Sequence, residues 1–463
     1  MDGKRIPQLQ AVLQVRTETP LEGWESYFFQ AGCRYAQEEA RSWLEGLDEQ
    51  LLAAKPKGWQ VVGSRSRTLV TRFGAVTFER RLYRDEQGGY HFLLDEVLCL
   101  PAHQAASEEV MESVIWLAAG LPFAWVSEAL VRLTAGVLSP STAWRLVQQV
   151  GRRVAEEEEG EVKRVFGQGQ PPQRVGQRQV RRLYVEADGV MVRQRMGGGR
   201  TGWQEVRLGV AYDEGGRERI YLQGAKGVDF WEGASLEWGA EWDWRSVEEV
   251  VVNGDDAPWI DEAGEMLAGV VRQLDRFHVV RAAYRAAGAE MGAALSEALQ
   301  AGDGQQVQEI WQQVPEPGKE APKKQKAAWT WLARHLEDPR MVRWWRRVGE
   351  SEVGVETLGH IESLVGAIVA HRMKGKRRHW SALGRQNMVK VLQVVHNGEV
   401  SAWCGRHQEK ADMPPQQAKA QSSHPRRSAD PGTWLHVHLP CLQNPLPTDP
   451  CLLRLREMIR LPN

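Results

Sequence analysis

The sequence has no long apolar run and few cysteines. None of its apolar stretches reaches the roughly 18 residues that a transmembrane helix needs, and the N-terminal MDGKRIPQLQAVLQV lacks the apolar core of a secretory signal. The five cysteines are scattered and odd in number, so a disulfide framework is not expected; they are Cys33, Cys99, Cys404, Cys441 and Cys451. These absences predict a cytoplasmic protein without a membrane partner.

Two chemical signatures are also missing. The histidines and cysteines near the C-terminus, from Cys404-x-x-His407 onward, match no standard zinc spacing. No serine or cysteine lies in a persuasive nucleophile motif, so no covalent protein intermediate is expected. The formal net charge of -1 gives no overall attraction to nucleic acid, although the charge is unevenly spread along the chain.

The chain does have length enough for several domains, since 463 residues exceed the size at which one core keeps growing. In the first region, residues 1–106, apolar spacing predicts a helix over 20–55 that ends at Pro56. Alternating residues around Gly74–Ala75 predict a β-hairpin, and YHFLLD predicts a third short strand.

Residues 107–154 return to a helical pattern with the layout of a helix-turn-helix. A first amphipathic helix ends near Gly136, and Ser139 with Pro140 offers an N-cap and a first-turn proline for a second helix. Arg145 and Arg152 on that second helix could contact DNA in a major groove. Two helices packed in an ordinary bundle are the alternative. Residues 155–182, rich in Gly, Gln, Pro and charge, predict a basic linker.

Strand patterns dominate from residue 183. The segments LYVEADGVMVRQ, WQEVRLGVAY, RERIYLQG and EEVVVNGD each predict a strand, and RQLDRFHVV predicts a fifth that runs into a helix. Three consecutive strands followed by strands alternating with helices indicate a mixed five-stranded α/β sheet, in the order of an RNase H-like core. We expect this core in 183–280 and 351–403, a helical insertion in 281–350, and a largely disordered tail in 404–463.

Three acidic residues lie where such a fold could use them. Asp188 precedes Gly189 after an apolar strand segment, Asp255 follows the fourth strand, and Glu362 lies in a helical segment. If the fold brings them together, their hard oxygen ligands suit Mg²⁺, with Mn²⁺ as the alternative, and two ions could assist an in-line phosphoryl displacement. Spacing alone leaves open that the aspartates belong to turns and the glutamate to a solvated surface.

Several motifs occur in a fixed order: VEADGV at 185–190, NGDDAPWI at 253–260, LDRFHVVR at 274–281, then GHIES and HRMKGKRRHWSALGRQNM. In this order and spacing they resemble the DDE transposases of bacterial insertion sequences, most closely the ISLre type and more distantly the Mutator-like branch. The resemblance covers most of residues 20–395. It implies that Asp188, Asp255 and Glu362 are the catalytic, metal-holding trio, because Glu362 precedes Arg372 by ten residues as in the family pattern.

The resemblance implies a transposase that binds the terminal repeats of an insertion sequence, cleaves their DNA and transfers it to a target strand. Its partners would be double-stranded DNA and further copies of the chain on that DNA, without a small-molecule substrate. Asp256 departs from the family, which usually has glycine there, and Glu356 is a rival to Glu362. Asp256 keeps open a catalytically inactive, transposase-derived DNA-binding protein, and the shared core keeps open an RNase H-like nuclease.

Further residues could bind DNA or support the site. Basic residues after Glu362 could bring phosphates to the metals unless they form only a solvated face; they are Arg372, Lys374, Lys376, Arg377, Arg378 and Arg385. Asp275 and Trp380 belong to the matched motifs. His278 would contact DNA or orient an acid, with a histidine packed at a helix start as the alternative. Trp259 is expected to pack under the site rather than to hold a flipped base.

Overall fold

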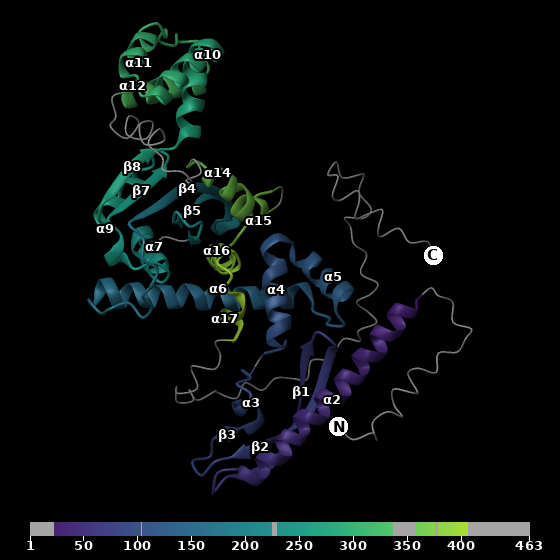
Figure 1. Ribbon diagram of the computed structural model, residues 1–463. Coiled ribbons are helices and arrows are strands. Elements are labelled where there is room, and N and C mark those ends of the chain that lie inside the picture. Colours follow the sequence, from purple (N-terminus) through teal and green to yellow (C-terminus); the bar gives the residue numbers. More distant parts are fainter. Residues whose placement is uncertain (1–22, 103, 225–228, 337–357, 376–377, 406–463) are drawn as a thin grey trace. The chain divides into compact units, whose positions relative to one another are not determined.

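The structure is a computed structural model that describes residues 23–102, 104–224, 229–336, 358–375 and 378–405 (Figure 1). Its first element, the long helix α2 (Trp24–Ala54), ends just before Pro56, as predicted. It packs on a hairpin of β1 (Gln60–Thr71) and β2 (Gly74–Arg84), where Asp48 of α2 accepts a hydrogen bond of 2.7 Å from Arg81. The predicted helix and hairpin are both present.

The predicted third strand is mostly wrong. Only Tyr90–His91 form a strand, β3, and the LLD of YHFLLD lies in the short helix α3 (Leu93–Val97). Helical geometry buries Leu94 and Asp95 together, and the Asp95 carboxylate receives a hydrogen bond of 2.6 Å from the buried Arg67. Pairing of a buried charge outweighs the strand preference of this segment.

Three helices follow: α4 (Glu108–Gly120), α5 (Phe123–Leu133) and α6 (Pro140–Val162). The Ser139 hydroxyl accepts a hydrogen bond of 3.0 Å from the Thr142 amide, so the predicted N-cap of α6 is present. The helix then continues through the first part of the segment expected to be a linker, and a π-helical turn follows it at Lys163–Gly167. Buried Val154 and Val162 explain the extension, because they continue its apolar face.

The five predicted strands all form, in one mixed sheet. They are β4 (Arg182–Arg195), β5 (Thr201–Tyr212), β6 (Glu218–Gln223), β7 (Glu249–Gly254) and β8 (Val270–Leu274). Their spatial order is β6-β5-β4-β7-β8. The pairs β6–β5 and β5–β4 are antiparallel, whereas β4–β7 and β7–β8 are parallel. The carboxyl ends of β4 and β7 therefore point the same way.

Apolar cores cover both faces of this sheet. One face packs against α7 (Phe230–Gly239), α8 (Pro258–Asp261) and α9 (Ala263–Met266), with Trp231 and Trp238 at its centre. The other face packs against α16 (Ala382–His396) and a helical segment formed by α14 (Ile361–Leu364), a π-helical turn (Val365–Ala370) and α15 (His371–Met373). The helices α4, α5, α6 and α17 (Val400–Gly405) belong to the same second core.

The predicted helical insertion is present as α10 (Arg276–Ala301), α11 (Gly304–Trp311) and α12 (Lys323–His335), which lie together in Figure 1 and enclose a core of their own. Residues 337–357, with the rival Glu356, and most of the predicted tail lie outside the described residues. No helix within the described ranges combines the length and apolarity required to cross a bilayer.

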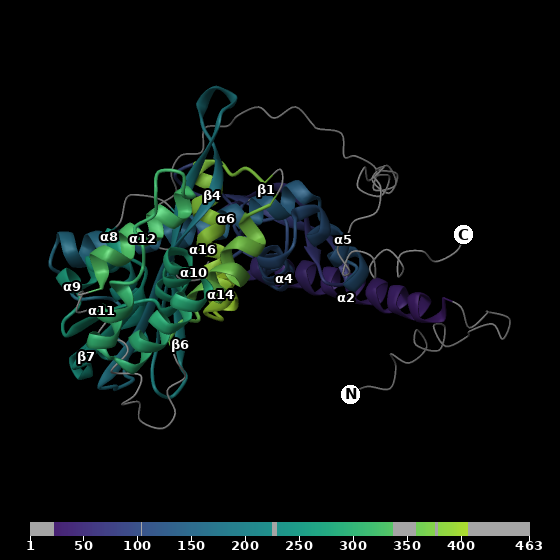
Figure 2. The same cartoon turned by 90° about the horizontal axis from the view of Figure 1, so that it is seen from above.

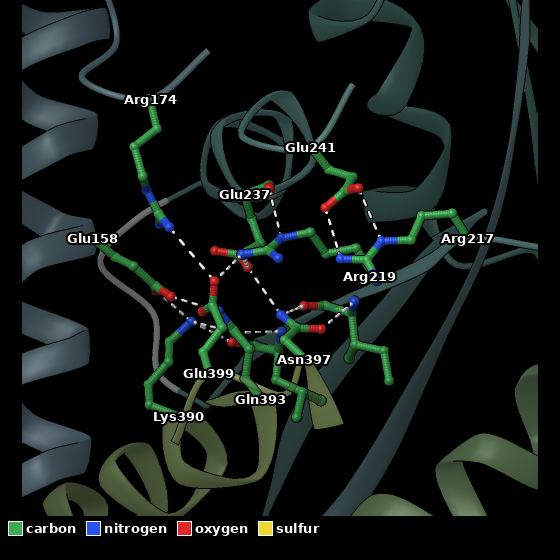
Figure 3. A network of polar contacts seen from close by, with 12 residues as sticks. Glu158, Arg174, Arg217, Arg219, Glu237, Glu241, Lys390, Gln393, Asn397 and Glu399 are labelled. Atoms are coloured by element: carbon green, nitrogen blue, oxygen red, sulfur yellow. Dashed lines mark hydrogen bonds and ion pairs between the residues drawn. The ribbon is translucent and has the colours of Figure 1, made fainter. Parts of the chain in front are cut away.

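A network of polar side chains joins the edge strand β6 to α16 and α6 (Figure 3). Gln393 accepts a hydrogen bond of 2.9 Å from the Leu222 amide, and Asn397 accepts one of 2.9 Å from the Ile220 amide. These contacts satisfy backbone groups that an edge strand would leave exposed. The helices α6 and α16 approach closely, since a Cβ on Gly151 would lie 2.1 Å from the Asn387 carbonyl oxygen. The middle of α6 is thus part of the core around the sheet.

Candidate active site

Asp188 and Asp255 lie side by side on neighbouring strands. The parallel pairing of β4 with β7 ends at Ala187 and Gly254, and the two aspartates are the next residues of each strand. Gly254 allows this approach, because a Cβ there would lie 2.5 Å from the Ala187 carbonyl oxygen. Asp188 is buried, and Asp255 is partly exposed.

Glu362 reaches the same region from α14. The carboxylate of Glu186, which is fully buried on β4, holds the start of this helix. Its Oε2 accepts hydrogen bonds from the amides of Gly359 (2.9 Å) and Ile361 (3.3 Å). An anion at this position also suits the partial positive charge of a helix N-terminus. A buried acid two residues before Asp188 therefore fixes the helix that carries Glu362.

The three carboxylates influence one another electrostatically. The pKa of Asp188 is raised to about 6, chiefly by burial and also by the nearby charges of Asp255 and Glu362, although the hydrogen bond from the Gly189 amide and the charge of His278 oppose the rise. Three separate segments, β4, the end of β7 and α14, thus place their acids within range of each other. That these three acids form one catalytic site stays a prediction.

His278 lies between Glu362 and Asp275. Its Nε2 is 3.4 Å from Oε1 of Glu362, and its Nδ1 is 3.2 Å from Oδ1 of Asp275. Burial lowers the pKa of His278, but the Asp275 carboxylate outweighs it and holds this pKa above its ordinary value. Burial likewise opposes ionisation of Asp275, yet hydrogen bonds from His278 and Asn253 keep the pKa of its carboxyl low. Both expected roles of His278, packing at a helix start and pairing with an acid, coexist.

Asn253 completes a chain of contacts beneath the acids. Its Nδ2 donates to Asp275 at 3.0 Å and lies 3.3 Å from Glu186. The hydroxyl of Tyr212 donates to Glu186 at 2.9 Å. Sequence reasoning missed Glu186, Asn253 and Tyr212. The available signal was an ionisable residue inside the apolar strand segment LYVEA, where burial of an acid requires hydrogen-bond partners.

Asp256, the departure from the family pattern, turns towards the insertion. Its Oδ2 lies 3.0 Å from Nε2 of His335 on α12. Asp255 is held differently: its Oδ1 accepts a hydrogen bond of 3.0 Å from the Ala257 amide, and Arg272 of β8 donates to its carbonyl oxygen. The two consecutive aspartates therefore have separate partners, and Asp256 has a structural contact of its own.

The oxygen atoms of the three acids are suitable ligands for a divalent metal, but the acids do not lie together as a group of metal ligands. Three carboxylates supply hard oxygen atoms, and a cation would offset the charges of Asp255 and Glu362, which together with burial, the larger cause, raise the pKa of Asp188. Across the described part of the chain, no three His, Cys, Asp or Glu side chains form a group that could hold a metal ion. Metal binding would require the acids to move closer together.

The two supporting tryptophans have structural contacts. Trp259 is 5% exposed, its ring centroid lies 4.7 Å from that of Phe230, and its carbonyl oxygen accepts a hydrogen bond of 2.6 Å from the Trp231 indole. This agrees with packing rather than base binding. Trp380 donates through its indole nitrogen to the Met373 carbonyl oxygen at 3.1 Å and pairs its backbone with β4.

Two of the arginines proposed to bind phosphate are buried, which corrects that expectation. Arg372 is 4% exposed and donates to the Ala118 carbonyl oxygen at 2.6 Å, and burial lowers its pKa to about 10. Arg385 is 5% exposed, and burial also lowers its pKa. Their stems complete the core between the sheet and the helices, so their sequence position beside Glu362 misleads. Arg145, Arg152 and Lys374 are exposed, Arg378 is half-buried, and Lys376 and Arg377 lie outside the described residues.

The fold and this site define a mixed α/β protein with interacting acids near the point where the parallel pairing of its two central strands ends. The profile of the Uncharacterised protein family UPF0236 matches residues 25–410, and the chain belongs to that family. Two UPF0236 proteins of Caldanaerobacter subterraneus subsp. tengcongensis are each 24% identical to it, one over 390 and one over 394 residues. These matches cover 79% of this chain and 75% and 76% of the relatives.

A further relative is the UPF0236 protein in the vanSb 3' region of Streptococcus gallolyticus. It is 33% identical over 150 residues, which is 32% of this chain. The match spans only 31% of the length of that relative. The family assignment therefore rests on the profile match, which extends from α2 to the end of α17.

Proposed function

We propose that this protein is a DDE-type DNA transposase that cleaves the ends of an insertion sequence and transfers them to a target strand. The observation that carries the proposal is the electrostatic convergence of Asp188, Asp255 and Glu362 from three separate segments. Asp188 is buried with a raised pKa beside two further carboxylates, and acids perturbed in this way concentrate at functional sites. Phosphoryl transfer is a reaction for which an all-carboxylate site is suited.

The residues of the chain would have distinct roles in this reaction. Asp188, Asp255 and Glu362 would hold Mg²⁺ or Mn²⁺. When bound, two such ions activate an attacking hydroxyl and stabilise the leaving oxygen. His278 would keep Glu362 oriented, since it contacts Glu362 on one side and Asp275 on the other. Glu186 would fix the position of the helix that carries Glu362 relative to β4.

The topology of the sheet supports the same proposal. Three antiparallel strands continue into two parallel ones, with the first strand at the centre, which is the strand order of an RNase H-like core. Asp188 lies on the first strand along the chain and Asp255 directly follows the fourth, where the pairing of these two strands ends. A helical insertion then separates them from Glu362, of the kind that Mutator-like transposases carry.

The relatives add a separate kind of support. The name of one Caldanaerobacter subterraneus relative joins 11 locus designations of a single organism. A gene that occurs at many places in one genome is what repeated transposition would produce. This observation is made on the relative. Because the present chain belongs to the same family, it supports the proposal that this chain is also encoded by a mobile element.

The unit of α5 and α6 is proposed to contact DNA as a helix-turn-helix. Arg145 near the start of α6 and Arg152 further along are exposed, while the opposite face of the helix packs into the core. A braced helix with exposed arginines fits the geometry of groove binding. The partner would be duplex DNA, bound by two or more copies of the chain because two element ends must be joined.

The test is metal-dependent cleavage of DNA that carries the sequences flanking the gene. The wild-type protein should cleave at the element ends with Mg²⁺ or Mn²⁺, and Asp188→Asn should reduce cleavage to background while DNA binding persists. Glu214→Gln, which changes an exposed acid outside the site, should cleave normally. Full cleavage by Asp188→Asn would refute the proposed site.

A second readout does not depend on cleavage. A cation at about 100 times its dissociation constant should stabilise the wild-type fold by about 2.7 kcal/mol, and Asp188→Asn should lose most of this gain. Among the described residues the acids do not form a group of metal ligands, which favours one alternative, a transposase-derived protein that binds DNA without cleaving it. That alternative predicts no stabilisation by Mg²⁺ in either protein. Cleavage without strand transfer would instead indicate a nuclease.

A further inference from the structure

The β4–β5 hairpin extends beyond the sheet next to the proposed active site (Figure 2). The strand β7 pairs with β4 only as far as Ala187, whereas β4 and β5 remain paired to Arg195 and Thr201. Beyond the end of β7, the free edge of β4 meets the segment that follows α15. The Arg195 amide donates to the Trp380 carbonyl oxygen at 2.7 Å, so hairpin and segment are tied together.

A hollow of about 670 Å³ lies between these two elements. The hairpin contributes Met191, Arg193 and Trp203, and the segment contributes Met373, Lys374 and Arg378. This volume is typical of a site for a small organic group. We call this hollow the hairpin groove.

The side chains of the hairpin groove combine flat apolar surface with positive charge. Trp203 is 54% exposed and Met191 is 45% exposed, although large apolar side chains are usually covered. The guanidinium of Arg193 lies 5.1 Å from the centre of the Trp203 ring and keeps that ring in place. Exposed aromatic rings held beside cations are the means by which proteins stack nucleic-acid bases.

The cations of the groove are available to phosphate. Within the described residues, neither Arg193 nor Lys374 forms an ion pair with a carboxylate. Glu205, which pairs across the hairpin with Met191, has its charge compensated by Arg207 at 3.1 Å. Arg378 donates to the carbonyl oxygens of His371 and Lys374 and so closes the end of α15. The groove is therefore positive without a protein anion to neutralise it.

The position of the groove indicates how a nucleotide would enter it. Met191 follows Asp188 by three residues on β4, a distance of roughly 10 Å along a strand. Since successive side chains alternate, Met191 and Asp188 point to opposite faces of β4. Met373 and Lys374 follow Glu362 on the other element of the site. A base in the groove would have to turn around the free edge of β4, out of the stack of a duplex.

From this juxtaposition we propose that the hairpin groove binds one unstacked nucleotide of the DNA strand beside the reacting phosphate, with its base on Trp203 and its phosphate at Arg193 and Lys374. The proposal rests on the proposed function, because it takes DNA as the substrate of the neighbouring acids. Trp203 would then hold the unstacked base, a role that Trp259 cannot have because it is buried.

The test is the binding of fluorescein-labelled (dT)12 to the full chain, measured by fluorescence anisotropy in EDTA so that no metal chemistry contributes. Trp203→Ala should weaken binding about tenfold, and Trp203→Phe should keep it within about threefold, because stacking requires an aromatic ring. Trp116→Ala removes a more exposed tryptophan (64%) on α4 and should change nothing. Blunt duplex DNA should bind Trp203→Ala and wild type alike.

Several results would overturn the groove assignment. The first is that Trp203→Ala binds (dT)12 as tightly as wild type, and the second is that Trp203→Ala and Trp203→Phe weaken this binding equally. The third is that Trp203→Ala loses duplex binding as much as (dT)12 binding. The fourth is that free dTMP saturates the groove with the affinity of (dT)12. Failure of the proposed function is distinguishable, since it would appear as absent metal-dependent cleavage by wild type while the Trp203 effect on (dT)12 remained. Cleavage by wild type together with normal binding by Trp203→Ala would remove the groove alone.

Discussion

The buried Oε2 of Glu186 accepts a hydrogen bond of 2.9 Å from the backbone amide of Gly359. These residues are 173 positions apart, and the contact joins the central strand β4 to the start of the helix that carries Glu362. Because Asp188 lies two residues further along β4, one strand both supplies an acid of the site and sets the position of another. The site is thus built around β4.

Glu186→Gln tests this relationship. The glutamine keeps the size of the side chain but replaces a carboxylate that accepts bonds from several donors, so unfolding should become easier by about 1.5–3 kcal/mol. The concentration of Mg²⁺ that gives half-maximal stabilisation should also rise, because Glu362 loses its fixed position. Thermal denaturation at graded Mg²⁺ concentrations measures both effects.

Glu214→Gln is the control for Glu186→Gln, since it changes an exposed acid in the turn that follows β5. It should leave the Mg²⁺ requirement unchanged. If Glu186→Gln lowers the melting temperature without altering the Mg²⁺ requirement, Glu186 serves stability alone.

Asp256→Asn tests whether the second aspartate of the motif belongs to the site. Its partner in the structure is His335 of α12, at 3.0 Å. The substitution should cost about 1 kcal/mol of stability or less, because asparagine can keep a hydrogen bond to the buried His335. Cleavage should stay within about twofold of wild type, because the change leaves the trio intact. A loss of cleavage as deep as that of Asp255→Asn would show that Asp256 is a ligand.

Much of this fold could be predicted from local patterns, and most of the errors arise where distant segments meet. The strands β4 to β8, the cap at Ser139 and the end of α2 before Pro56 each follow from a few neighbouring residues. The helix α3 in place of a strand depends instead on a buried contact between Asp95 and Arg67, which no local pattern contains.

The same distinction explains which residues of the site could be predicted from the sequence and which could not. Asp188 and Asp255 stand out because each is next to a glycine and follows an apolar strand segment. Glu186 and Asn253 looked like ordinary strand residues, and only the folded chain gives them partners from other segments. Arg372 was misjudged for the converse reason: beside exposed lysines in sequence, it points inward to the Ala118 carbonyl oxygen.

Arg372 and Lys374 should differ when each is changed to glutamine. Arg372→Gln removes a buried cation that bonds the backbone of α4, so unfolding should become easier by roughly 2–4 kcal/mol with little change in the salt dependence of DNA binding. Lys374→Gln should leave stability within about 0.5 kcal/mol. It should reduce the slope of log K against log salt by about one, because one phosphate contact is lost. Titrations with (dT)12 at several salt concentrations measure the slope, and equal slopes for the two variants would contradict this division of roles.

Glu237 provides a pH-dependent stability that is independent of the active site. It lies on α7 inside the network of Figure 3, where Arg219 contacts it at 2.7 Å and Asn397 donates to it at 2.9 Å. Burial raises the pKa of its carboxyl from 4.5 to about 7, which Arg219 opposes and the charges of Glu158 and Glu399 reinforce. One arginine between two carboxylates, Glu237 and Glu399, leaves the deeper one incompletely compensated.

The sign of the effect follows from this raised pKa. Between pH 4.5 and about 7, the folded protein binds a proton at Glu237 that the unfolded chain does not. The contribution of Glu237 to the free energy of unfolding is therefore greatest below pH 4.5 and decreases as the pH rises to about 7. The loss amounts to at most about 3 kcal/mol. Glu237→Gln keeps an acceptor for Asn397 and removes the titration, so its stability relative to wild type should increase between pH 5 and pH 8. Urea denaturation of both proteins at these pH values measures the difference, with Glu214→Gln as a control that should show none. A relative stability of Glu237→Gln that is constant over this range would mean that Glu237 stays ionised in the folded protein and that Arg219 compensates its charge fully.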